Sequence, residues 1–262
     1  MLRQRVISAA ILIPIVGAAA YLGGLFFFAL VLLAGLLAGY EFFAATCPQE
    51  CPPFYLIPLL LIALLIADGQ RPEWGLLQPA LLFGTLGALT LKVFHENKPG
   101  SLKSWALMLA GALYIGLSLS YFPRLRTLDR GLFWLLVALL GTWTTDTGAY
   151  FVGSAFGRRP FFSKISPHKT WEGAVSGIVS GIALVSILGR WLLGLGWGQG
   201  IALGAVLALG ATFGDLAESL LKRQVGIKDF GRLIPGHGGM LDRVDSLLFV
   251  VPLVYYMAII LV

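Results

Sequence analysis

Two pairs of acidic residues in the carboxyl-terminal third of the sequence share the same spacing. Asp215 and Glu218 lie three positions apart, and so do Asp242 and Asp245. On a helix this spacing puts both carboxylates of a pair on one face, with Cβ atoms about 5–6 Å apart. Mg²⁺ binds oxygen ligands, typically one or two carboxylates together with substrate phosphates. The pairs therefore predict a magnesium site for phosphoryl chemistry, in which two ions about 3.5–4 Å apart hold the attacking and leaving oxygens.

Each pair also has a structural explanation. Glu218 and Lys222 are four residues apart and could form an ion pair worth about 0.2–0.5 kcal/mol on an exposed helix. Asp242 and Asp245 open a predicted helix, where the helix dipole favours acids. Asp215 is not explained in this way. An acid within a membrane-spanning helix costs about 2.5–3.5 kcal/mol, so it normally has a partner or a purpose.

The segment between the two pairs combines glycine with positive charge. Pro235 stops a helix, and four glycines nearby allow backbone N–H groups to approach an anion. These glycines are Gly231, Gly236, Gly238 and Gly239. The basic residues of the segment are Lys222, Arg223, Lys228, Arg232, His237 and Arg243. The composition predicts a phosphate-binding loop, although a lone loop histidine such as His237 is more often simply solvated.

A second segment, 163–177, has the form of an anion site at the start of a helix. Thr170 is placed to cap that helix. The free backbone N–H groups of such a start would point toward Lys164, His168 and Lys169. Lys169 and Thr170 are therefore candidates for phosphate binding.

Asp146 stands in a predicted membrane segment among four threonines, Thr142, Thr144, Thr145 and Thr147. We expect Asp146 to be buried, with the threonine hydroxyls able to satisfy its carboxylate. A structural role and a contact with a metal or nucleotide are equally open for this residue.

The composition requires a membrane environment for all of these residues. The chain is 58% hydrophobic and 12% charged, with a mean hydropathy of +0.85, which a water-exposed surface does not match. Continuous apolar stretches of about 17–25 residues predict helices rather than a barrel. The prediction is an all-α polytopic membrane protein of about nine transmembrane helices. They are expected at 5–22, 24–46, 53–68, 74–91, 104–122, 131–152, 171–194, 199–222 and 245–262.

The basic residues predict the orientation in the membrane. If the amino terminus is cytoplasmic, fourteen of the 19 Lys and Arg residues fall on the cytoplasmic side, as the positive-inside rule requires. Arg124, Arg126 and Arg130 would lie on the outer side in this orientation, against the rule. The first 24 residues imitate a secretory signal, but a second apolar run follows at once and favours an uncleaved helix. We expect one membrane domain over 1–262, with a scaffold at 1–130 and a catalytic half at 131–262 whose site faces the cytoplasm.

The basic loops, the two cysteines and the spaced glycines do not indicate further active sites. The basic residues lie in short loops without a stacking platform, so they suit anionic lipids and substrates rather than nucleic acid. Cys47 and Cys51 lack the further ligands of a zinc site. Glycines spaced by four residues, as at Gly173 and Gly177, predict close helix packing within the bundle or between subunits.

The polar segments together resemble the signature of phosphatidate cytidylyltransferases, also called CDP-diacylglycerol synthases. The resemblance is carried by 219–245, which includes Pro235-Gly-His-Gly-Gly-Met-Leu-Asp-Arg-Val-Asp245, and by 146–150, 166–173 and 5–8. The segments span nearly the whole chain. His168 departs from the pattern, because relatives often carry lysine there.

The resemblance implies transfer of CMP from CTP to phosphatidate, giving CDP-diacylglycerol and pyrophosphate. It also implies Mg²⁺, a dimeric polytopic enzyme and a bacterial plasma membrane location. Two metal ions are expected, the second of which could be monovalent. The metal ligands would be Asp215, Glu218, Asp242 and Asp245, with Asp215, Asp242 and Lys222 central to catalysis. The substrate-binding residues would be Arg223, Lys228, Arg232, His237, Gly238, Gly239, Arg243, Lys169, Thr170, Ser219 and Asp146.

Two other functions stay open at this point. A membrane phosphotransferase acting on an activated lipid alcohol, such as a CTP-dependent polyprenol kinase, would need similar groups. A secondary transporter could use intramembrane acids to couple protons or ions. The sequence argues against a transporter, because the acids lie at predicted helix ends beside basic residues and no repeated half is visible.

Overall fold

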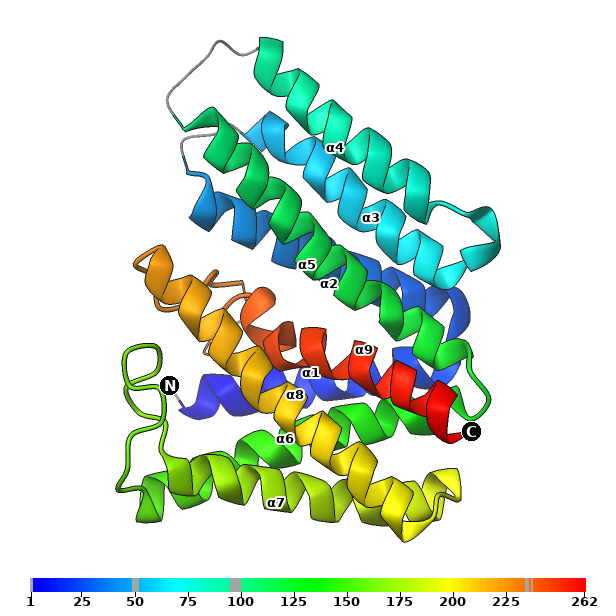
Figure 1. The fold of residues 1–262 in the computed structure, drawn as a ribbon, viewed down its shortest axis with the longest axis vertical. Coiled ribbons are helices and arrows are strands. Elements are labelled where there is room, and N and C mark those ends of the chain that lie inside the picture. The colour runs from blue at the N-terminus through cyan, green and yellow to red at the C-terminus, as the bar shows by residue number, and fades with distance from the viewer. Residues whose placement is uncertain (1, 49–51, 95–99, 234–235, 237) are drawn as a thin grey trace. The chain divides into compact units, whose positions relative to one another are not determined.

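The computed structural model describes residues 2–48, 52–94, 100–233, 236 and 238–262, with only the backbone at 2–7, 9, 52 and 53. Within these ranges the chain is helical almost throughout and forms no β-strand (Figure 1). An isolated antiparallel bridge joins Pro160 to Thr170. The prediction of an all-α protein is confirmed.

The described residues form nine α-helices with three short helical turns between them. The α-helices are α1 (Leu2–Leu22), α2 (Gly24–Thr46), α3 (Leu56–Gln70), α4 (Leu77–Phe94), α5 (Ser101–Thr127), α6 (Gly131–Phe156), α7 (Trp171–Leu188), α8 (Trp197–Gln224) and α9 (Leu241–Leu261). The short elements are the 3₁₀ turns η1 (Pro52–Tyr55) and η2 (Pro72–Trp74) and the π-helical turn η3 (Gly189–Leu193). Each predicted apolar segment corresponds to one α-helix.

Six helices within the described residues are long and apolar enough to cross a membrane. They are α2, α4, α5, α7 continued through η3, α8 and α9. The apolar part of α1, Ala10–Leu22, and the whole of α3 are shorter. The prediction of a polytopic membrane protein is therefore supported by six candidate spans, while the count of nine crossings stays a prediction.

The first of two compact units contains Met1–Arg124 together with Asp229–Arg243. In it α2, α3, α4 and α5 lie side by side (Figure 1). The helices approach closely where glycine is present: the side chains of Ile62 and Ile66 on α3 occupy the space beside Gly39 and Gly35 of α2. By its contacts, the segment Asp229–Arg243 belongs to this unit. The sequence prediction grouped it with the catalytic half.

A buried ion pair links α3 to α5 in the first unit. Arg124 donates from a terminal nitrogen to Asp68 Oδ2 at 2.6 Å, and the backbone N–H of Leu77 donates to Asp68 Oδ1 at 2.9 Å. Asp68 is 3% exposed. Its carboxylate therefore joins the end of α3 both to α5 and to the start of α4.

The second unit contains Leu125–Lys228 together with Val244–Val262. Its helices α6, α7, α8 and α9 also meet at glycines. Gly177 of α7 lies against the backbone of Thr145, and Gly204 of α8 lies against Ile182. Gly214 of α8 lies against the backbone of Ser246 on α9. A Cβ atom at these glycines would overlap the neighbouring helix, so the prediction that they serve close packing is confirmed.

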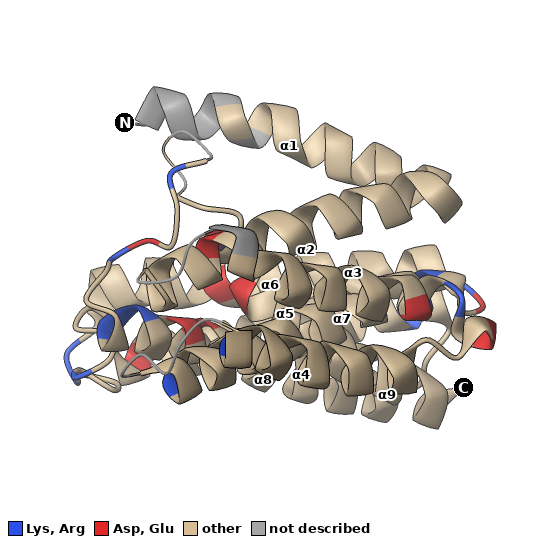
Figure 2. Ribbon diagram, turned by 90° about the horizontal axis from the view of Figure 1, so that it is seen from above, with Lys and Arg blue, Asp and Glu red and all other residues tan. Residues whose placement is uncertain are grey.

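The charged residues are unevenly distributed along the helices. Figure 2 shows Lys and Arg at helix ends and in connecting loops, with the middle portions of the helices mostly uncharged. This is the distribution expected when apolar helix middles face hydrocarbon and charged ends face water.

Candidate active site

The start of α7 is fixed by a short hydrogen-bonded segment. Thr170 caps the helix, with its Oγ1 accepting the N–H of Gly173 at 3.2 Å, as predicted. The Phe161 N–H donates to the Lys169 carbonyl, and the Trp171 N–H donates to the Arg159 carbonyl. These bonds hold the residues just before the helix in place, so Lys169 projects from a defined backbone.

Lys169 forms an ion pair with the first of the predicted catalytic acids. Its Nζ lies 2.6 Å from Asp215 Oδ2, and the side chains are 25% and 37% exposed, respectively. The pair joins the segment before α7 to α8. Asp215 thus has the partner that the sequence alone could not name.

One helical turn further along α8, Lys222 Nζ lies 2.5 Å from Glu218 Oε2. The predicted ion pair is present, but it is not a surface pair, because Glu218 is 0% exposed. Asp245 of α9 lies beside Glu218 and close enough to Asp215 for charge repulsion. The second unit therefore gathers three acids and two lysines in a small volume.

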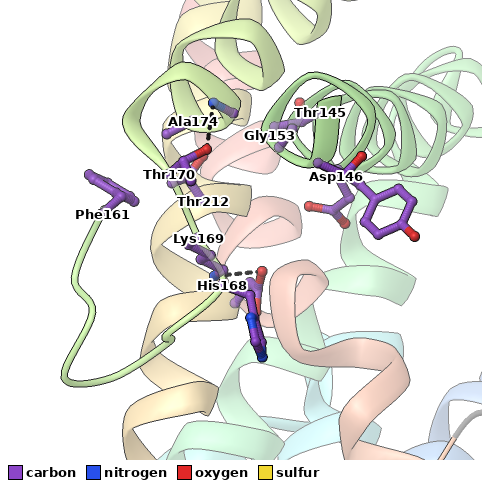
Figure 3. A pocket seen from close by; sticks show the side chains of 14 residues that line it. Thr145, Asp146, Gly153, Phe161, His168, Lys169, Thr170, Ala174 and Thr212 are labelled. Carbon is purple, nitrogen blue, oxygen red and sulfur yellow. Dashed lines mark hydrogen bonds and ion pairs between the residues drawn. The ribbon is translucent and has the colours of Figure 1, made fainter. Parts of the chain in front are cut away.

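A cavity of about 450 Å³ opens beside this group within the second unit (Figure 3). Its lining includes Asp146 of α6, Lys169 and Thr170 before α7, and Asp215 of α8. Phe161, Ala149 and Ala174 supply apolar wall. The volume lies within the range of about 300–1,000 Å³ that small-molecule sites occupy, and the polar groups converge on an otherwise apolar wall, as in most such sites.

Asp146 differs from expectation. It is exposed rather than buried, and it projects from α6 at the cavity (Figure 3). The hydroxyls of Thr142 and Thr145 donate to the carbonyls of Ala138 and Gly141, at 2.8 and 2.9 Å. These threonines use their hydrogens within α6, as hydroxyls in apolar helices commonly do, so they cannot donate to Asp146 at the same time.

Asp242 belongs to a separate group in the first unit. It is 6% exposed, and its Oδ2 accepts the N–H of Phe230 at 3.0 Å and of Gly239 at 2.8 Å. Gly238 has a positive φ of 84°, which glycine adopts at little cost. The carboxylate thus joins the backbone of Phe230 and of Gly239 to the first turn of α9.

Sequence reasoning missed Glu41 on α2. One of its carboxylate oxygens, Oε2, accepts the N–H of Leu241 at the start of α9, at 3.0 Å. Its carboxylate also lies against Gly231 and Gly239. The available signal was an acid near the end of a predicted membrane helix, where acids usually have a partner or a function.

The remaining predicted residues take several positions. Arg223 donates from Nε to the Ile165 carbonyl at 3.1 Å and so braces the loop before α7. The other basic candidates with described positions, Lys228, Arg232 and Arg243, are exposed. Ser219 is partly buried on α8. His237 lies outside the described residues.

The acids of the second unit have the donor chemistry of a magnesium site, since all three offer carboxylate oxygen. Glu218 and Asp245 both tend to carry negative charge and lie close together, which is the kind of arrangement a cation would stabilise. Among the described residues, however, no three His, Cys, Asp or Glu side chains converge on one metal position. The donor set fits Mg²⁺, while the two lysines now neutralise Asp215 and Glu218.

Comparison with known proteins gives consistent matches over most of the chain. The sequence profile described as "Cytidylyltransferase family" matches residues 3–261. A relative from Synechocystis is 34% identical over 98% of this chain and 97% of its own length. One from Haemophilus influenzae is 36% identical over 98% of each chain. One from Bacillus subtilis is 39% identical over 67% of this chain and 66% of its own length. All three bear the name phosphatidate cytidylyltransferase.

Proposed function

Because this chain belongs to the cytidylyltransferase family, we propose that it is a phosphatidate cytidylyltransferase, which transfers CMP from CTP to phosphatidate. Relatives that match nearly the whole chain carry that name. The structural observation that carries the proposal is the Lys169–Asp215 ion pair at the wall of a ligand-sized cavity, with two further acids beside it.

The reaction joins two polyanions. An oxygen of the phosphatidate phosphate attacks the α-phosphorus of CTP, a new P–O bond forms, and the bond to the β-phosphate breaks to release pyrophosphate. A phosphomonoester alone carries about −1.5 to −2 charges near neutral pH. Because the lipid phosphate is itself the nucleophile, the protein needs to position the two substrates and stabilise charge rather than to form a covalent intermediate.

We assign Asp215, Glu218, Asp242 and Asp245 to the metal ligands. Mg²⁺, when bound, neutralises phosphate charge and orients the phosphoryl oxygens. Asp215, Glu218 and Asp245 offer carboxylate oxygen in one group of the second unit. Asp242 lies on the same helix as Asp245, three residues earlier. Two metal positions are proposed, the second of which could hold a monovalent cation.

Lys169 and Lys222 are proposed to bind phosphate oxygens. Each ammonium group forms an ion pair with a carboxylate. Both lysine side chains are positively charged and long enough to contact an anion at the cavity. Further positive charge would come from Arg223, Lys228, Arg232, His237 and Arg243. Thr170, Ser219, Gly238 and Gly239 are proposed to contribute hydroxyl and backbone contacts.

Asp146 is proposed to bind the nucleoside part of CTP. A carboxylate at the cavity wall accepts hydrogen bonds and repels phosphate. Phosphatidate has no hydrogen-bond donor outside its phosphate, because both remaining glycerol oxygens are esterified. CTP has donors in the amino group of cytosine and in the ribose hydroxyls, so the nucleoside is the substrate part that complements Asp146.

The membrane arrangement is part of the proposal. We infer nine crossings, with the amino terminus and the site on the cytoplasmic side of a bacterial plasma membrane, since most basic residues then face the cytoplasm. That positive face would also attract anionic lipids. A homodimer is proposed from the resemblance to the family.

The test is pyrophosphate release by the detergent-purified protein with CTP, Mg²⁺ and phosphatidate, leaving out each component in turn. Release that requires all three, with CDP-diacylglycerol as the lipid product, supports the proposal. Diacylglycerol in place of phosphatidate serves as the lipid control. If the folded protein releases no pyrophosphate but phosphorylates a polyprenol with CTP or ATP, the proposal is overturned in favour of a kinase. Ion-coupled uptake in vesicles would favour a transporter.

A further inference from the structure

Glu41 lies in α2, far in sequence from the signature segment, yet it contacts that segment at three places. Its Oε2 accepts the Leu241 N–H at 3.0 Å, and the Met240 backbone also hydrogen-bonds to the carboxylate. The carboxylate therefore binds N–H groups at the amino-terminal end of α9. Free N–H groups at a helix start attract negative charge, so this contact explains how an acid is tolerated in an apolar helix.

Gly231 and Gly239 leave room for the Glu41 carboxylate. A Cβ atom at Gly231 or at Gly239 would overlap the Glu41 carboxylate. Neither residue has a positive φ, so close approach, rather than backbone conformation, explains glycine at these positions. The glycines of the signature thus make room for a carboxylate of the protein itself.

Asp242 holds the same segment from the other side. Its Oδ2 accepts the N–H groups of Phe230 and Gly239, and the ring of Phe230 stacks on Phe42, with centroids 5.9 Å apart. Gly239 therefore contacts both carboxylates, since its N–H bonds to Asp242 and its Cα lies beside Glu41. Glu41 and Asp242 act on the loop as one hydrogen-bonded unit.

Glu41 has the wrong surroundings for a metal ligand. Its Oε2 accepts a backbone N–H group, which carries positive partial charge and competes with a cation.

We propose that Glu41 is a positioning residue that fixes the backbone around Gly231, Gly239 and Leu241, and through it the side chain of Asp242. The inference rests on the proposed function, because Asp242 acts in catalysis only if the chain is a cytidylyltransferase. Glu41 itself touches no substrate in this account. Its removal should loosen the loop and weaken the response to Mg²⁺ and CTP.

The direct readout is hydrogen exchange of the metal-free protein in lipid nanodiscs. In Glu41→Ala, peptides containing Gly239 and Leu241 should exchange at least about tenfold faster, the effect of losing one or two charge-assisted hydrogen bonds. Peptides of α3 and α4 should be unchanged. Glu41→Gln keeps one acceptor oxygen and should restore most of the protection.

Kinetics separate positioning from general stability. Glu41→Ala should raise the KM for CTP and the half-saturating Mg²⁺ concentration by about tenfold or more, and Glu41→Gln should be affected much less. Asp68→Asn is the matched control, because Asp68 is another buried acid of the first unit with a structural ion pair. Its loss should lower the melting temperature and leave both half-saturation values unchanged.

A double-mutant cycle tests the contact between Glu41 and Gly239. Gly239→Ala should speed hydrogen exchange at Leu241 in the wild type and have little further effect on it in Glu41→Ala, because the overlap is then relieved. Gly226→Ala is the control. A Cβ atom there meets nothing within 4 Å and is disfavoured only by the positive φ of 73°, so its cost should be the same with and without Glu41.

Unchanged exchange at Gly239 and Leu241 in Glu41→Ala would overturn the inference, as would additive effects of Glu41→Ala and Gly239→Ala on exchange. These measurements do not depend on the reaction. If the wild type forms no CDP-diacylglycerol, the proposed function fails while the exchange data still decide whether Glu41 holds the loop.

Discussion

Lys169 Nζ lies 2.6 Å from Asp215 Oδ2, joining the segment before α7 to α8 at the wall of the cavity. The two residues are 46 positions apart in the chain, and only Lys169 belongs to a segment of the sequence signature. The ion pair leaves each group accessible in part, with 25% and 37% of the side chains exposed. Both groups are therefore partly accessible to a ligand in the cavity.

Asp215→Asn should abolish turnover while leaving the protein folded. The amide keeps the shape of the side chain but loses the charge that a cation requires, so we expect a fall in kcat/KM of about 10²–10³-fold or more. Helix content and elution as a single species should match the wild type. Near-normal rates would remove Asp215 from the metal ligands.

Lys169→Met should reduce kcat/KM by a factor similar to that of Asp215→Asn, but through a raised KM. Removing the ammonium group deletes a phosphate contact, so the KM for CTP or phosphatidate should rise. Lys164→Met is the control, because Lys164 is an exposed lysine of the same loop and should have little effect. Equal effects of the two substitutions would show that the loop contributes only general positive charge.

The helical fold could be predicted from the sequence, and much of the site could not. Apolar runs of membrane length located every helix because hydrocarbon allows few other structures. Thr170 was predictable as a cap because capping is local in sequence. The Lys169–Asp215 pair and the Glu41–Leu241 contact join distant positions, and no local pattern encodes such contacts. Asp146 was expected to be buried among threonines, but neighbouring residues in sequence face different sides of a helix.

Asp146→Asn should alter the recognition of the nucleotide. A carboxylate can only accept hydrogen bonds, whereas an amide can also donate to the carbonyl of uracil. We expect the preference for CTP over UTP, measured as a ratio of kcat/KM values, to fall by about tenfold. If only the ratio of kcat/KM for CTP to kcat/KM for 2′-deoxy-CTP changes, Asp146 lies at the ribose. An unchanged KM for CTP with a raised KM for phosphatidate would contradict the assignment.

Asp68→Asn should destabilise the first unit without changing the chemistry. Breaking a buried ion pair by removing one charge leaves the other uncompensated, at a cost of about 3–5 kcal/mol, and Arg124 is only 20% exposed. The thermal midpoint in detergent should fall clearly, while KM values remain those of the wild type. A raised KM for CTP would show that this ion pair also shapes the site.

Removal of metal should stop the reaction and leave more uncompensated carboxylate charge around α8. Excess chelator is expected to abolish pyrophosphate release, and added Mg²⁺ should restore it. With Lys222→Met the acids Glu218 and Asp245 lose their ammonium partner, so they should depend more strongly on a cation. Mg²⁺ should then raise the melting temperature of Lys222→Met more than that of the wild type. An equal increase in both proteins would mean that the cation does not bind near Glu218, and the metal assignment would then rest on Asp215 and Asp242 alone.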